Sequence, residues 1–214
     1  MKVLVDNDVL FKGSCYGLLD DLVAAVCPGD GFVGVLGAAR FVLPKKIRQS
    51  KSRKDPELAL AALLGFLARS AEVEPIEEEQ MLAADLELAA QQIGVSLDVG
   101  ESQLCAILVQ RLVPLLFTGD KRAIASIERL LDSNPRLVAV CGKVVCLEQA
   151  LAAAYARFGG DRLRSAVCAE PEIDKALTIC FSCSSESVPS ESHMQGLISY
   201  IADLRKSARR ALAP

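Results

Sequence analysis

The chain has 214 residues, of which 51% are hydrophobic and 24% are charged, and its formal net charge is −3. This length suits one domain with room for an appended subdomain, and the apolar fraction is ample for a core. The slightly acidic balance excludes a protein that is basic over its whole surface, so any site for a polyanion must be local. The longest apolar stretches, such as Leu58 to Ala68, are shorter than the roughly 20 residues of a membrane-spanning helix. We expect no membrane span.

The cysteines and the single histidine limit the kinds of site that the chain can build. The amino terminus carries Asp6 and Asp8 where a secretory signal peptide has an apolar run, so we expect a cytoplasmic protein whose eight cysteines are thiols. A CxxC pair inside the apolar ICFSC is more typical of core packing than of zinc binding, although four cysteines have suitable spacing: Cys141, Cys146, Cys180 and Cys183. His193 is the only histidine, which excludes two-His metal sites, and we expect it at the surface of a Ser-rich loop.

The first half of the chain predicts alternating strands and helices. Lys2 to Val5 is an apolar run that ends in Asp6-Asn7-Asp8, as in a buried parallel strand with polar groups at its carboxyl end. A basic segment from Arg40 to Lys54 contains no acidic residue. The other expected elements are a helix at Ser14–Cys27, a strand at Phe32–Leu36, and helices at Leu58–Ser70 and Ile76–Ile93.

The second half predicts further alternation and then only helices. The expected strands are Val95–Leu97, Leu115–Thr118 and Leu137–Val140. The expected helices are Gly100–Leu112, Lys121–Leu131, Val144–Phe158, Asp161–Cys168, Glu170–Ser182 and Glu191–Ala211. This order predicts an α/β domain over residues 1–142 with a central, mostly parallel sheet, followed by an all-α C-terminal extension over residues 143–214.

Acidic residues follow the ends of several expected strands. They are Asp6 and Asp8, Asp98 and Glu101, and Asp120. The carboxyl ends of strands in an open α/β sheet meet in one crevice, so these side chains are expected to lie together. Clustered carboxylates repel one another unless cations neutralise them, and Mg²⁺ and Mn²⁺ favour oxygen ligands. The sequence therefore predicts a Mg²⁺ or Mn²⁺ site held by Asp6, Asp8, Glu101 and Asp120, suited to hydrolysis of a phosphodiester.

Three segments, VDNDVL, GESQLCAIL and FTGDKRAIASI, resemble the PIN-domain family of metal-dependent nucleases in their order and spacing. The resemblance covers roughly residues 1–142 and implies a PIN-like three-layer fold. It also implies that Asp6, Glu101 and Asp120 are the catalytic residues, with Thr118 and Arg122 flanking the last of them. The family usually has another acid after the second strand, where VLGAARFVLPKK has none. Either Asp85 or Glu57 substitutes for it, or the site is incomplete.

The resemblance implies a metal-dependent endoribonuclease that hydrolyses RNA, acting as a toxin or as an RNA-processing nuclease. The expected partners are RNA and, through the helical tail, a cognate antitoxin or another protein; an oligomer is compatible with the sequence. We expect contacts to phosphate or RNA from four cationic side chains: Arg122, Lys45, Lys46 and Arg48.

Several alternatives stay open. An acid that follows a strand is also typical of a helix cap or a turn. Asp98 and Glu101 have the spacing of a capping box, so we expect Asp98 to be structural. Asp6-Asn7-Asp8 also resembles the haloacid dehalogenase-like phosphatases, although Leu10 stands where that family usually has Thr. In a third hypothesis the chain is a catalytically silent PIN-like module that binds a protein.

Overall fold

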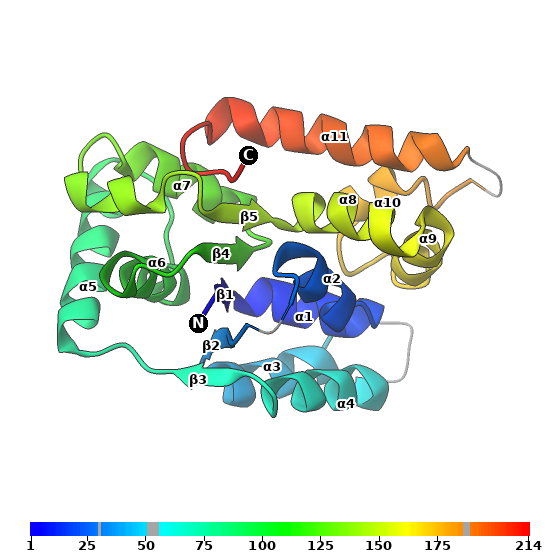
Figure 1. The fold of residues 1–214 in the computed structure, drawn as a ribbon, viewed down its shortest axis with the longest axis horizontal. Coiled ribbons are helices and arrows are strands. Elements are labelled where there is room, and N and C mark those ends of the chain that lie inside the picture. The colour runs from blue at the N-terminus through cyan, green and yellow to red at the C-terminus, as the bar shows by residue number, and fades with distance from the viewer. Residues whose placement is uncertain (30, 51–55, 186–188) are drawn as a thin grey trace.

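The computed structural model describes residues 1–29, 31–50, 56–185 and 189–214, which form an α/β fold (Figure 1). Its strands are β1 (Val3–Val5), β2 (Val33–Leu36), β3 (Ala71–Val73), β4 (Leu115–Thr118) and β5 (Val144–Cys146). Its helices are α1 (Asn7–Tyr16), α2 (Leu19–Val26), α3 (Ala39–Arg48), α4 (Pro56–Leu67), α5 (Glu77–Gln92), α6 (Val99–Arg111), α7 (Lys121–Leu130), α8 (Leu147–Phe158), α9 (Gly160–Cys168), α10 (Lys175–Cys180) and α11 (Ser190–Ser207), with a 3₁₀ helix, η1, at Pro135–Val140.

The five strands form one sheet in the order β3-β2-β1-β4-β5, and all neighbouring strands run parallel. The expected α/β class with a parallel central sheet is confirmed. At the centre Val5 lies opposite Phe117, and the backbone N–H of Asp6 donates to the Phe117 carbonyl at 2.9 Å. The carboxyl ends of β1 and β4 are therefore level, so the residues that follow them share one edge of the sheet.

Helices cover both faces of the sheet, which gives three layers (Figure 1). Val3 and Val5 pack with α1 to α4 and with α8 to α10, whereas Leu4, between them, packs on the other side with α5 to α7. Side chains alternate across a strand, so a strand buried on both faces has to be apolar throughout. That requirement explains the run Val-Leu-Val before Asp6.

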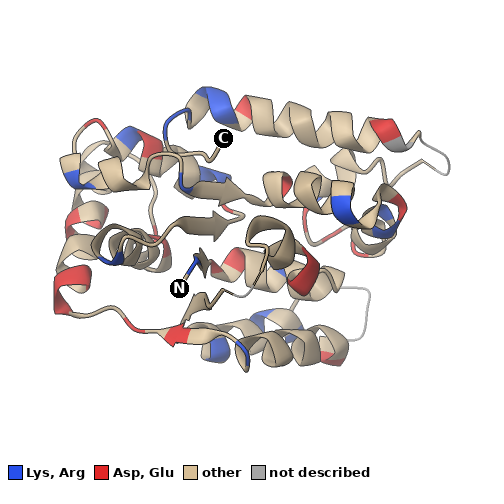
Figure 2. Ribbon diagram, viewed as in Figure 1, with Lys and Arg blue, Asp and Glu red and all other residues tan. Residues whose placement is uncertain are grey.

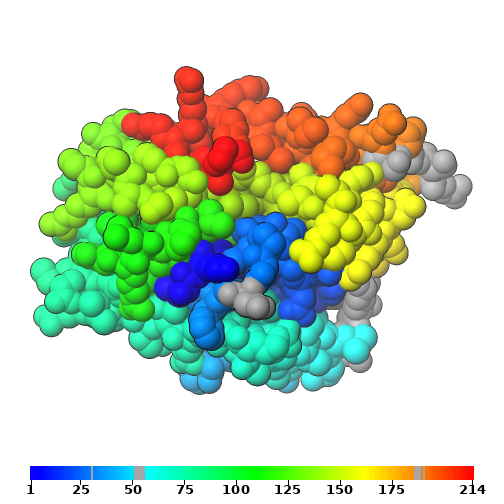
Figure 3. Space-filling view, in the orientation of Figure 1, coloured from blue at the N-terminus to red at the C-terminus, as the bar shows by residue number. Residues whose placement is uncertain are grey.

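The C-terminal region contributes to the sheet as well as covering it. β5 pairs with β4, and beyond it Leu212 bridges to Val144 while the Ala213 N–H donates to the Val144 carbonyl at 2.7 Å. The residues of α11 lie along one long edge of the molecule (Figure 3). The expectation that residues 143–214 are all α-helical is therefore wrong, because this segment supplies a strand.

Several expected elements differ from those in the structure. The helix expected at Ser14–Cys27 is two helices, α1 and α2, because Gly17 takes a left-handed conformation (φ 70°) that ends the first. Leu137–Val140 belongs to η1, which begins at Pro135, instead of a strand. Residues 95–97 form no strand, α10 is shorter than expected, and β3 and α3 were not predicted.

The expectations for the cysteines and for His193 also need correction. Cys168 and Cys183 form a disulfide, since the end of α9 and the turn after α10 bring their Cα atoms to 5.0 Å. His193 lies in α11 and is only 1% exposed, with its ring against Phe181. No helix in the described ranges combines the length and apolar character needed to cross a membrane. Ribbon segments coloured for Lys and Arg (blue) and for Asp and Glu (red) both occur on the outer helices (Figure 2).

A buried ion pair joins α5 to the end of α6. The Glu79 side chain is fully buried, and its two carboxylate oxygens accept hydrogen bonds from Arg111 Nε and Nη2 at 2.6 and 2.7 Å. Glu79 also accepts from the Ile76 N–H at 2.9 Å, so it caps α5 as well. The hydrogen bonds from Arg111 lower the pKa of Glu79, despite its burial, and the Ile76 N–H lowers it further.

We predict that Glu79→Gln lowers the free energy of unfolding by about 2 kcal/mol at pH 7, because it removes a charged hydrogen-bond acceptor. The lowered pKa means that this stabilisation is present above the unfolded-state pKa near 4.5 and is lost as the pH falls through the folded-state value. Urea denaturation at pH 7 and at acidic pH measures both effects. Glu77→Gln, an exposed position in the same helical turn, is the matched control; an equal loss in both variants would contradict the prediction.

Candidate active site

A cleft of about 550 Å³ opens at the carboxyl edge of the sheet. Among the described residues, five carboxylate side chains and two cationic ones line it, so this part of the cleft is acidic. Its lining residues are Asp6, Asn7, Asp8, Lys46, Asp98, Val99, Gly100, Glu101, Asp120 and Arg122. All of the acids that the sequence placed at strand ends therefore border one cavity, although they come from three distant parts of the chain.

Asp6 connects the two central strands to the start of α1. Its carboxylate accepts from the Asn7 N–H at 2.6 Å and from the Thr118 hydroxyl at 3.0 Å, and the residue is only 7% exposed. Thr118 Oγ1 in turn accepts from the Asp120 N–H at 3.2 Å. Burial, followed by the charge of Asp8, raises the pKa of Asp6 to about 6 against the lowering effect of these hydrogen bonds. Asp6 is thus a buried, hydrogen-bonded carboxylate whose charged form is disfavoured by its surroundings.

Asp8 lies in the first turn of α1 and approaches the loop after β4. A Cβ atom on Gly119 would come within 2.4 Å of Asp8 Oδ2, so the position between Thr118 and Asp120 has no room for a side chain. Asp8 Oδ2 also forms an ion pair with Lys12 Nζ at 2.7 Å, one helical turn further on. Asp8 consequently has a counter-ion, whereas Asp6 forms no ion pair with any residue that the structure describes.

Asp98 and Glu101 form the capping box that their spacing predicts. The Glu101 N–H donates to Asp98 Oδ1 and the Asp98 N–H donates to Glu101 Oε2, both at 2.8 Å. Burial raises the pKa of Glu101 to about 7; the Asp98 N–H opposes this, and the charges of Asp98, Asp120 and Asp6 add to it. The structural role expected for Asp98 is confirmed, and Glu101 both caps α6 and feels the other acids of the cleft.

Asp120 is the N-cap of α7 and is held by Arg122. Its Oδ1 accepts from the backbone N–H of Arg122 at 2.8 Å and of Ala123 at 3.3 Å, and its Oδ2 pairs with Arg122 Nη2 at 3.0 Å. Burial would raise the pKa of Asp120, but the bonds from Arg122 outweigh it and keep the pKa below its usual value. The Arg122 side chain is 84% exposed, so it can leave Asp120 for another anion with little loss of packing.

The predicted phosphate-binding cations separate into two groups. Lys46 and Arg122 line the cleft, and Lys46 Nζ lies 4.5 Å from the centre of the Phe11 ring. Lys45 and Arg48 are exposed on α3 outside the lining, and Arg48 pairs with Glu57 at 3.3 Å. Residues 51–54 of the basic segment lie outside the described residues. The proposed substitutes for a further acid are also away from the cleft, since Glu57 pairs with Arg48 and Asp85 faces Arg136.

The side chains of the cleft have the chemistry that a hard divalent cation requires, but they are not arranged around a common point. The cleft offers carboxylate oxygens with an excess of negative charge, which Mg²⁺ and Mn²⁺ favour. In the conformation described, however, no three His, Cys, Asp or Glu side chains of the described residues converge as an ion-binding group. The oxygens of Glu101 and Asp120 serve their own helix caps instead. Rotation of these side chains would be needed to assemble a complete coordination shell.

Three residues at this edge were not predicted to belong to the site: Lys12, Gly119 and Asp174. Lys12 follows Asp8 by one helical turn, a spacing that typically pairs opposite charges, and this was the available signal. Gly119 lies inside the TGD segment, but the local sequence does not indicate its close approach to Asp8. Asp174 reaches Lys12 at 2.6 Å from a distant part of the chain, and no local pattern indicates that contact.

Comparisons with protein-family models, with curated proteins and with solved structures found no match to the chain.

We predict that Glu101→Gln stabilises the protein in the presence of EDTA at pH 8. Since the folded-state pKa is raised to about 7, ionisation of Glu101 disfavours folding, and the wild type loses stability as the pH rises from about 4.5 through 7. Glutamine keeps the acceptor for the Asp98 N–H without the charge. We expect a melting temperature roughly 3 °C higher than wild type at pH 8, with no difference at pH 4. An equal or lower melting temperature at pH 8 would refute this.

Proposed function

We propose that the chain is a metal-dependent endoribonuclease with a PIN-like domain, acting on single-stranded RNA in the cytoplasm. The observation that carries the proposal is the meeting of Asp6, Glu101 and Asp120, the three acids expected to be catalytic, in one acidic cleft at the carboxyl edge of a parallel sheet. Open α/β sheets bind ligands at this edge. After burial, which has the larger effect, the charges of Asp120 and Asp6 also raise the pKa of Glu101, which supports the grouping of these three acids.

In this proposal Asp6, Glu101 and Asp120 hold a Mg²⁺ or Mn²⁺ ion, with Asp8 at the edge of the group. A bound ion of this kind lowers the pKa of water and offsets charge on a phosphoryl group. Asp6 is the fixed element, because Thr118 and the start of α1 hold its carboxylate. Glu101 and Asp120 stand at the starts of α6 and α7 and approach the cleft from the sides.

The cations of the cleft would bind the RNA backbone. Arg122, which is mostly exposed, can exchange its pairing with Asp120 for the phosphate at the cleavage point, and a guanidinium suits that contact because it binds two oxygens at once. Lys46 at the rim would contact a neighbouring phosphate. In the part of the cleft that the structure describes, two cations beside five carboxylates favour a few local contacts with a single strand over a broad duplex-binding surface.

The position of Leu10 favours this proposal over a phosphatase of the haloacid dehalogenase type. That family usually has a Thr two residues beyond its second Asp, where this chain has Leu10. Leu10 is fully buried in the hydrophobic core, so this position supplies no hydroxyl group to the cleft.

We predict that Asp120→Asn lowers the rate of single-stranded RNA cleavage on the order of 100-fold with Mg²⁺ or Mn²⁺ present. Asparagine is as good an N-cap as aspartate, so α7 should be preserved. The measurement is cleavage of an end-labelled RNA, with EDTA added as a second means of abolishing activity. The matched control is Asp132→Asn, an exposed position just past the other end of α7, which should cleave at the wild-type rate.

Two outcomes would contradict the proposed function. Hydrolysis of p-nitrophenyl phosphate without RNA cleavage would identify a phosphatase. Absence of turnover on both substrates, together with no Mn²⁺ binding by calorimetry, would identify a catalytically silent module that binds a protein partner.

A further inference from the structure

A lysine shared by two carboxylates lies beside the acidic cleft. Lys12 Nζ is 2.7 Å from Asp8 Oδ2 and 2.6 Å from Asp174 Oδ2, and the three side chains are only 13%, 24% and 12% exposed, respectively. Asp8 and Lys12 belong to α1, whereas Asp174 comes from the C-terminal region, just before α10. The C-terminal region therefore places a charged group next to the site.

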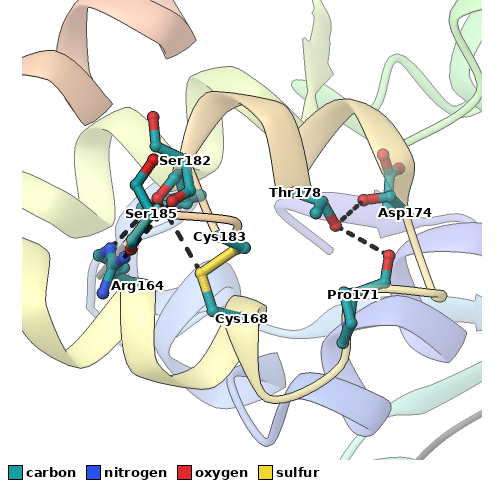
Figure 4. Close-up of a disulfide and its surroundings, with 9 residues drawn as sticks. Arg164, Cys168, Pro171, Asp174, Thr178, Ser182, Cys183 and Ser185 are labelled. Carbon is teal, nitrogen blue, oxygen red and sulfur yellow. Dashed lines mark hydrogen bonds between the residues drawn. A yellow bond between two sulfur atoms is a disulfide. The ribbon is translucent and has the colours of Figure 1, made fainter. Parts of the chain in front are cut away.

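Asp174 is fixed by its own surroundings (Figure 4). Its Oδ1 accepts from the Ala176 and Leu177 N–H groups at 2.9 and 3.1 Å, so it caps α10 while Oδ2 faces Lys12. The Thr178 hydroxyl is within hydrogen-bond distance of the Asp174 carbonyl at 3.0 Å, and the disulfide between Cys168 and Cys183 ties together the ends of the segment that contains it. These bonds restrict the movement of Asp174, so the ion pair holds the Lys12 side chain toward it.

The charges on Lys12 and Asp174 are maintained at neutral pH. Burial opposes the charge on Lys12, but Asp8 and Asp174 outweigh it and raise the Lys12 pKa. Burial likewise opposes the charge on Asp174, but Lys12 outweighs it and keeps the Asp174 pKa low. Two negative charges and one positive charge leave the group with a net charge of about −1. Without Asp174, Lys12 would neutralise Asp8 completely.

The group also faces a continuation of the acidic cleft. A second cavity of about 290 Å³ is lined by Lys12 and Asp174, and it shares Asp8, Asp120 and Arg122 with the first. The charge on Asp174 is therefore not separated from the proposed metal ligands by a layer of protein.

We propose that Asp174 is a positioning residue of the cleft, which shares Lys12 with Asp8 and so preserves the negative charge that attracts a divalent cation. This inference rests on the metal binding in the proposed function. The segment of the C-terminal region between α9 and α10 then sets the cation affinity of a site built on the sheet.

The test is the affinity for Mn²⁺ alone, measured by titration calorimetry on the full chain. Asp174→Asn keeps the helix cap but removes one negative charge, and should weaken binding on the order of fivefold. Lys12→Met removes the positive charge and should tighten binding by a similar factor. The double variant Asp174→Asn/Lys12→Met restores the net charge of the group and should return the affinity to about the wild-type value.

These signs distinguish an electrostatic role from a merely structural one, because structural damage would weaken binding in both single variants and more so in the double variant. Asp203→Asn and Lys206→Met change an exposed pair on α11 in the same way and should leave the affinity unchanged. If wild type binds Mn²⁺ but the Asp174 variant or the double variant departs from these expectations, this inference alone fails. If wild type binds no Mn²⁺, the proposed function and this inference fail together.

Discussion

The buried carboxylate of Asp6 is the constraint on which the rest of the site depends. It lies at the end of the central strand, accepts the first N–H of α1, and is joined through the Thr118 hydroxyl to the end of β4. Thr118 then receives the N–H of Asp120, so the start of α7 is set by the same small network. A single acid therefore fixes the relative positions of two strands and two helices, and the other carboxylates of the cleft take their places around it.

The acids that cap helices at the cleft stabilise those helices, but they also concentrate negative charge there. Three helices, α1, α6 and α7, begin at the cleft, and at each start an acid accepts backbone N–H groups. The positive ends of the helix dipoles partly offset the carboxylate charges. Burial, and after it the charges of neighbouring acids, still raises the pKa values of Asp6 and Glu101. An acid that caps its own helix therefore also repels the acids beside it, and a cation in the cleft would reduce that repulsion.

Much of this site could be predicted because its geometry follows from strand ends. Apolar runs located β1, β2 and β4, and the residues after β1 and β4 had to share an edge with them. The capping box of Asp98 and Glu101 followed from a spacing of three residues. Short-range patterns of this kind are written in the local sequence, and they gave the parallel sheet and the acidic cleft.

The rest could not be predicted because it depends on contacts between distant segments. The three-residue run Val-Val-Cys of β5 is as compatible with a helix start as with a strand, and only its pairing with β4 decides. The burial of His193 depends on Phe181, and the disulfide depends on how the segment after α10 turns back to α9. The pairing of Lys12 with Asp174 likewise has no local signature.

The strand order has a consequence for how the chain reaches this structure. β1 can pair with β2 after only one intervening pair of helices, but Asp6 and Thr118, at the ends of β1 and β4, are 112 residues apart in sequence. Closing so long a loop is slow, and until it closes the other edge of β1 stays unpaired. The most apolar strand of the sheet is then an open template for a second chain. Folding of this protein is therefore expected to compete with aggregation at high concentration, at the step in which the two halves of the sheet join.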